Sequence, residues 1–226
     1  MRAYRQIGLV PRCLPIFAVA LGVSWQCRAG SLDVQVVDSD NRPIPGVAVY
    51  AVPSKPGQRA AAPAPPTAVM DQEHTAFVPH VLIVQTGTLV DFPNNDIVSH
   101  HVYSFSKAKT FELGLYKGDA HPPILFDHPG LVVLGCNIHD SMLGYILVVD
   151  TPHFAQTMQT GHARLADLPS GEYTVHVWTE RARPKDLPDE VVAHVGSEMT
   201  NVAFRIEGKL QPAHDHGDSS LTWERY

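Results

Sequence analysis

Between about Val69 and Asp150, no stretch of the sequence places apolar residues at helical spacing, which argues against helices there. The apolar residues come in short runs, many of them alternating with polar residues, and 19 prolines and 16 glycines are spread among the runs. Short alternating runs between Pro and Gly turns are typical of β-strands joined by tight connections. The sequence therefore predicts an all-β protein, long enough for one large domain or two small ones.

The first 29 residues have the organisation of an export signal. Arg2, Arg5 and Arg12 give a basic start, "LPIFAVALGVSW" follows as an apolar stretch, and Ala29 is a suitable cleavage point. The apolar stretch is shorter than the roughly 20 residues that a membrane span needs. We expect a signal peptide over 1–29 and a periplasmic or otherwise exported protein, with no membrane span in the mature chain. Lipidation at Cys27, or retention of the segment as an anchor, stays open.

Removal of the signal changes the charge and the cysteine count. Four arginines leave with it and no acidic residue does, so 13 basic residues remain against 23 acidic ones, a net charge of −10. Such a surface repels nucleic acid and favours a partner with a basic surface. Of the three cysteines only Cys136 remains, so an internal disulfide is impossible. A single thiol in an oxidising compartment indicates intermolecular pairing, a reactive thiol or a metal ligand.

The strand pattern divides the mature chain. Residues 31–60 hold two predicted strands and the start of a Pro- and Ala-rich linker, 66–150 about eight short strands, 155–208 four more, and 209–226 a polar tail with His214 and His216. The segment "AKTFELGLYKGDAHPP" within the second region lacks a regular pattern and is expected to be irregular. A two-stranded hairpin is marginal in water. We therefore predict that the first two strands pair with those of 155–208 in a small β-sandwich, and that 66–150 is inserted in this sandwich or flanked by it.

The segment "LGCNIHDSMLG" sets Cys136, His139 and Met142 at even spacing, in the order C-x-x-H-x-x-M. A thiolate, two imidazoles and a weak axial thioether are the donors of a blue-copper site. The second imidazole should come from a neighbouring strand, and "NNDIVSHHVYSF" offers one where a turn leads into an alternating strand. Neighbours on a strand point to opposite faces, so only one of His100 and His101 is expected to reach the metal.

These motifs resemble the cupredoxin family, to which plastocyanin and amicyanin belong. The family pairs a first His at a strand start with a C-x-P-H-x-x-M-type ending, and "PGLVVLGCNIHDSMLGYILVV" matches the short amicyanin loop. The resemblance implies a Greek-key β-sandwich that holds one copper ion, Cu(I) or Cu(II), with His100, Cys136, His139 and Met142 as metal ligands. The whole chain further resembles cupredoxin-domain proteins often labelled methylamine-utilisation proteins. The segments 36–52 and 163–178 resemble the prealbumin-like (carboxypeptidase regulatory-like) sandwich, which implies a second small sandwich around the first.

The chain departs from the cupredoxin pattern at four positions. His101 stands where Asn usually follows the first His, which leaves open whether His100 or His101 is the ligand; Val102 at the family's apolar position favours His100. Ile138 replaces the Pro before the second His, and Gly135 replaces the usual aromatic before the Cys. Asp140 puts a carboxylate beside His139, where the family has an apolar docking patch.

The expected function is one-electron transfer by an exported blue-copper protein, with a redox protein as partner. Two alternatives remain: a periplasmic copper carrier or sensor with the same ligands, and a metal-free β-sandwich interaction module. Enzymatic activity is not expected, because the sequence has no C-x-x-C pair, Gly-rich phosphate loop or Ser elbow. A Cys–His nucleophile pair also fits poorly, since no third orienting residue is evident.

Overall fold

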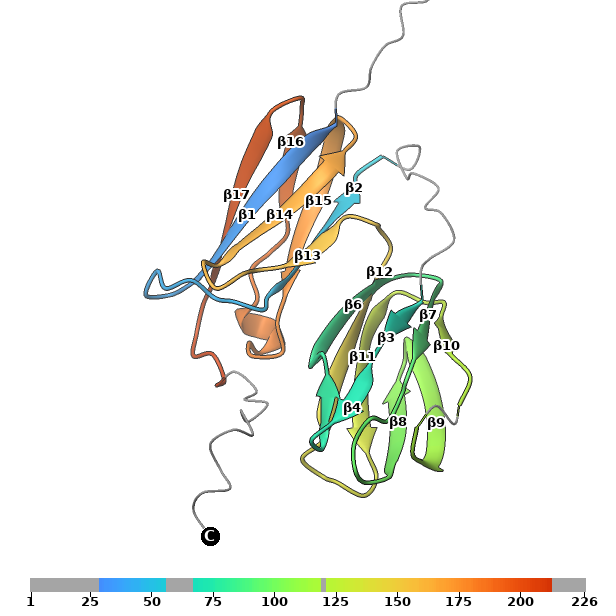
Figure 1. The fold of residues 1–226 in the computed structure, drawn as a ribbon. Helices are drawn as coiled ribbons and strands as arrows, with labels where there is room; N and C mark the ends of the chain where they lie inside the picture. The colour runs from blue at the N-terminus through green and yellow to red at the C-terminus, as the bar shows by residue number, and fades with distance from the viewer. Residues whose placement is uncertain (1–28, 56–66, 119–120, 213–226) are drawn as a thin grey trace, which may run out of the picture.

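The computed structural model describes residues 29–55, 67–118 and 121–212, and across these ranges it is built of β-strands with one short 3₁₀ turn. The signal segment apart from Ala29, most of the Pro- and Ala-rich linker, and His214 and His216 lie outside the described residues. Within the described ranges no helix is long and apolar enough to cross a membrane. The predicted all-β, β-sandwich fold is confirmed (Figure 1).

One sandwich is built from strands that lie near both ends of the described chain. Its sheets have the strand orders β14-β1-β17 and β13-β2-β15-β16. The strands are β1 (Gly30–Asp38), β2 (Ala48–Pro53), β13 (Phe154–Gln156), β14 (His162–Leu168), β15 (Gly171–Trp178), β16 (Val191–Val195) and β17 (Met199–Ile206). Leu32, Val34 and Val36 alternate inward from β1 and are fully buried, which is the pattern expected of a strand with one face on the core. The N-terminal strands are thus stabilised by partners more than 100 residues away.

The second sandwich has sheets of order β6-β12-β11-β8-β9 and β10-β7-β3, with the two-stranded β4-β5 beside them. Its ten strands are β3 (Ala68–Val69), β4 (Asp71–Glu73), β5 (Ala76–Val78), β6 (Val81–Gln85), β7 (Thr88–Asp91), β8 (His100–Ser106), β9 (Lys109–Tyr116), β10 (Ile124–Phe126), β11 (Gly130–Cys136) and β12 (Leu143–Val149). About eight had been expected, and the excess comes from two- and three-residue strands too short to show alternation. Phe77, Phe126 and Ile146 are among its fully buried core residues.

Strand β9 corrects one expectation, because the segment predicted to be irregular contains an eight-residue strand. β9 lies at the edge of the five-stranded sheet and pairs only with β8. Its exposed residues outnumber its buried ones, with only Leu113 and Tyr116 fully inside. An edge strand buries too little to impose alternation on its sequence, and this is why the pattern was missed.

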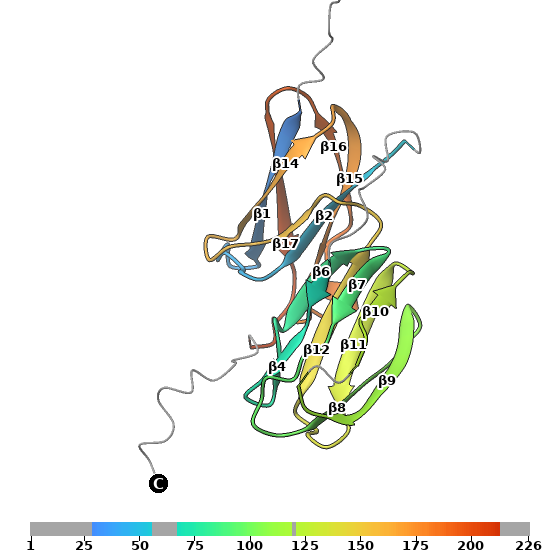
Figure 2. The ribbon, with the colours of Figure 1, turned by 45° about the vertical axis from the view of Figure 1, so that its right-hand side comes forward.

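The two sandwiches meet through a small apolar cluster, and one lies above the other in both views (Figures 1 and 2). Ala48 of β2 packs with Leu147 and Val149 of β12, and the rings of Tyr145 and Trp178 meet edge to face at 5.6 Å. The side-chain amide of Gln156 also donates to the carbonyl of Val81 at 3.0 Å. These contacts lie on the outer face of the five-stranded sheet, away from its own core.

Candidate metal centre

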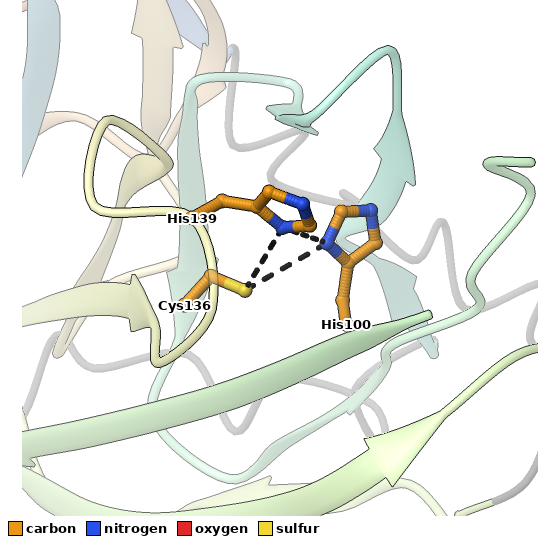
Figure 3. A group of neighbouring side chains, drawn as sticks. All are labelled: His100, Cys136 and His139. Atoms are coloured by element: carbon orange, nitrogen blue, oxygen red, sulfur yellow. Dashed lines mark hydrogen bonds between the residues drawn. The ribbon is translucent and has the colours of Figure 1, made fainter. Parts of the chain in front are cut away.

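Three side chains with metal-binding atoms converge at one end of the second sandwich. His100 Nδ1 lies 3.1 Å from His139 Nδ1, and Cys136 Sγ lies 3.7 Å from the first of these atoms and 3.6 Å from the second. Figure 3 shows both rings turning these nitrogens toward the sulfur. His100, Cys136 and His139 thus form a group of His and Cys side chains, among the described residues, whose metal-binding atoms are close enough together to hold one metal ion.

Strand ends and one short loop position the three side chains. His100 opens β8 and Cys136 closes β11, and the two strands pair in antiparallel register with Cys136 opposite Val102. The loop that follows is tied back to β8, because the amide of Asn137 donates to the carbonyl of His101 at 3.0 Å. The amide of Met142 donates to the carbonyl of His139 at 2.9 Å, which closes the loop into a turn. Each side chain is therefore held by hydrogen-bonded backbone.

A carboxylate behind His100 fixes which ring nitrogen faces the cluster. Asp96 Oδ2 lies 3.0 Å from His100 Nε2, and both residues are buried. Burial alone would raise the pKa of Asp96, but hydrogen bonds from the Thr75 amide, His100 and the Ile97 amide together hold its pKa below the ordinary value. With the carboxylate ionised, His100 Nε2–H donates a hydrogen bond to Asp96 Oδ2, so the lone pair of His100 is on Nδ1 and points at Cys136 and His139.

Asn94 holds the turn that carries Asp96. Its side-chain amide donates to the carbonyls of Val98 and Tyr116 at 3.0 and 2.9 Å, and its Oδ1 accepts the amide of Asp96 at 3.0 Å. Asn94 and Asp96 were absent from the predicted site residues. The signal was present in "NNDIVSH", where short polar side chains capture nearby backbone groups at a turn, but sequence alone does not show which of them faces the histidine.

The donor set fits a soft transition metal. A trigonal metal with bonds of about 2.0 Å to nitrogen and 2.3 Å to sulfur would separate the nitrogens by about 3.5 Å and each nitrogen from the sulfur by about 3.7 Å. The observed separations of 3.1, 3.6 and 3.7 Å lie close to these values. Thiolate with imidazole suits copper and zinc, and no carboxylate joins the group that would favour Mg²⁺ or Ca²⁺.

The two neighbouring histidines lie on opposite faces of β8. His100 is fully buried within the cluster, whereas His101 points outward and pairs with Glu112 of β9, with 2.7 Å between Nε2 and Oε1. The structure thus brings His100, and not His101, to Cys136 and His139. Met142 is 2% exposed and belongs to the same apolar core as Cys136.

Two exposed apolar residues and one exposed carboxylate are sequence neighbours of the site residues. His139 is partly exposed, while His100 and Cys136 are buried. Ile97, which follows the carboxylate residue, is 87% exposed, and Ile138, which precedes His139, is 49% exposed. Asp140, which directly follows His139 in the sequence, is exposed.

No protein-family model and no curated protein matches the chain. Among solved structures, a purple cupredoxin from Nitrosopumilus maritimus is 20% identical with a TM-score of 0.33, covering 36% of this chain and 99% of its own. A mutant of amicyanin in its reduced state is 19% identical with a TM-score of 0.34, covering 44% of this chain and 99% of its own. Nothing in these similarities bears on methylamine utilisation.

Proposed function

We propose that the chain is an exported blue-copper protein that transfers single electrons. His100, Cys136 and His139 would hold one copper ion, and Met142 would supply the weak axial sulfur. The observation that carries the proposal is the convergence of Sγ and two Nδ1 atoms within 3.7 Å of one another, with Asp96 holding the tautomer of His100.

The surroundings of the site suit electron transfer better than chemistry on a bound substrate. Copper supplies a one-electron couple when bound. The residues around it are held on paired strands and a hydrogen-bonded loop, which limits the rearrangement between oxidation states. The soft sulfur donors suit Cu(I), and the imidazoles suit both states. With four protein donors no position remains for a substrate, so we propose no enzymatic activity.

The exposed edge of His139 is the proposed exchange point with a redox partner. Ile138, which precedes His139 and is exposed, offers an apolar contact there, and the net charge of −10 that follows loss of residues 1–29 favours a partner with a basic surface. Asp140 adds a carboxylate at this edge and strengthens that preference. Export to the periplasm, or to another oxidising compartment, is proposed from the signal-like first 29 residues.

Copper titration of the mature protein tests the proposal. We expect one equivalent of Cu(II) to give an intense visible thiolate-to-copper absorption band and a reversible one-electron response at an electrode. Cys136→Ser and His100→Gln should abolish the band, and His101→Gln, the matched control, should retain it. Tight colourless binding of Cu(I) with no reversible couple would indicate a carrier or sensor. No binding and no rise in melting temperature with copper would indicate a metal-free module.

A further inference from the structure

A cleft lies where the two sandwiches meet, and none of its lining residues belongs to the metal centre. Its volume of about 590 Å³ is within the range of pockets that hold small ligands. Leu147 of β12 lines the cleft from the second sandwich. The other lining residues come from β2, from β15 and from the segment 187–190, which connects the 3₁₀ turn Pro184–Asp186 to β16. The cleft is therefore a candidate binding site of its own.

Three aromatic side chains, Tyr50, His176 and Trp178, form one wall of the cleft. Tyr50 and His176 lie directly opposite each other across β2 and β15, and their rings stack with centroids 4.8 Å apart and an interplanar angle of 14°. Trp178 lies two residues further along β15 and on the same face of the sheet as His176, since alternate residues of a strand share a face. Leu147 and Leu187 add aliphatic surface. This aromatic wall can cover the apolar part of a small ligand.

The charge of the cleft is negative. Its lining includes Asp189 and Glu190, which are both exposed, and no Lys or Arg among the described residues. Glu190 Oε2 lies 3.6 Å from His176 Nδ1, but burial outweighs this carboxylate and lowers the pKa of His176, so the ring is uncharged at neutral pH. Burial and, to a smaller extent, Glu190 raise the pKa of the Tyr50 hydroxyl, which keeps its proton. A ligand in the cleft thus meets two carboxylates with no cation beside them.

We propose that the cleft binds a small organic ammonium ion, with the ammonium group at Asp189 and Glu190 and the apolar part against the aromatic wall. Carboxylates form strong hydrogen bonds with ammonium groups, and aromatic rings attract cations. The same carboxylates would repel an anion, and an uncharged apolar ligand would gain nothing from them. This inference goes beyond the proposed electron transfer and does not depend on bound copper.

Calorimetric titration of the mature protein with phenethylammonium, and with phenethyl alcohol as its uncharged analogue of similar shape, tests the proposal. We expect the ammonium ion to bind saturably and about tenfold or more tightly than the alcohol, a difference typical of charge-assisted hydrogen bonds. Glu190→Gln should weaken ammonium binding severalfold, and Glu190→Gln combined with Asp189→Asn should weaken it further. Glu172→Gln is the matched control, because Glu172 Oε2 lies 3.7 Å from His194 Nε2 in a similar pair outside the cleft. It should leave the affinity unchanged.

Three results would overturn the proposal. The first is equal affinity for the ammonium ion and the alcohol, which would mean that charge is not recognised. The second is undetectable binding of the ammonium ion. The third is an affinity that loss of both carboxylates leaves unchanged, or that Glu172→Gln lowers as much as Glu190→Gln, because the ion would then bind elsewhere. None of these results bears on the copper titration, so the proposed electron transfer would stand or fall separately.

Discussion

At the scale of single residues, the two adjacent histidines of β8 allow a matched comparison. Each contacts one carboxylate, but only His100 faces Cys136. His100 pairs with buried Asp96 and His101 with exposed Glu112. Carboxylates behind metal-binding histidines typically change metal affinity by roughly 10- to 100-fold. We therefore expect Asp96→Asn to weaken copper binding by at least about tenfold.

Competition with a chelator of known copper affinity measures this effect. Glu112→Gln is the matched control, since it removes the carboxylate partner of the outward-facing histidine and should leave copper affinity unchanged. Equal affinities in the two variants would mean that Asp96 does not orient a ligand.

At the scale of strands, the packing of the β4–β5 hairpin against the five-stranded sheet depends on a glycine. A Cβ on Gly144 of β12 would lie 2.8 Å from Cβ and Cδ2 of Phe77, which is fully buried, whereas Gly114 of β9 has nothing within 4 Å. Forcing atoms into a packed core costs about 1–3 kcal/mol. We expect Gly144→Ala to lower the free energy of unfolding by that amount in urea, and Gly114→Ala to leave it the same or slightly higher. Equal effects would contradict the packing described.

Ionisation of Tyr116, the last residue of β9, should destabilise the fold at high pH. Tyr116 donates to the carbonyl of Phe92 at 2.7 Å, and burial raises the pKa of its hydroxyl to about 12. Because the raised pKa favours the protonated form in the folded state, its stabilisation is complete below pH 10 and is lost as the pH rises toward 12. Between these values wild type should lose on the order of 2 kcal/mol more stability than Tyr116→Phe. Parallel pH profiles for the two proteins in urea unfolding would contradict this.

The alternation of apolar and polar residues determined which strands could be predicted from the sequence. Alternation predicted β1, β8 and β11 because each buries one face. It missed β9, an edge strand, and β13, which has three residues and no fully buried one. Motif spacing pointed to Cys136 and His139, but the choice of His100 over His101 rested on strand parity and a family position. Asp96 contacts His100 within the turn that precedes β8, only four residues away, but the sequence does not show which polar side chain of that turn faces the histidine.

At the scale of the whole molecule, the junction between the two sandwiches should make them unfold together. Leu147, Val149 and Ala48 are buried between them, and Trp178 covers Tyr145. In calorimetry we expect wild type to unfold in one transition that copper moves to higher temperature as a whole. Trp178→Ala should split it into two transitions, of which copper shifts only the one belonging to the second sandwich. Two independent transitions in wild type would show that the junction does not couple them.

X-ray absorption spectroscopy of the copper-loaded mature protein would reveal whether one thiolate and two imidazoles bind a single copper ion. We predict one short copper–sulfur distance and two copper–nitrogen distances with the scattering pattern of imidazole. In Cys136→Ser the short sulfur contribution should vanish. A copper ion surrounded only by nitrogen and oxygen, or a spectrum that Cys136→Ser leaves unchanged, would rule out Cys136 as a copper ligand.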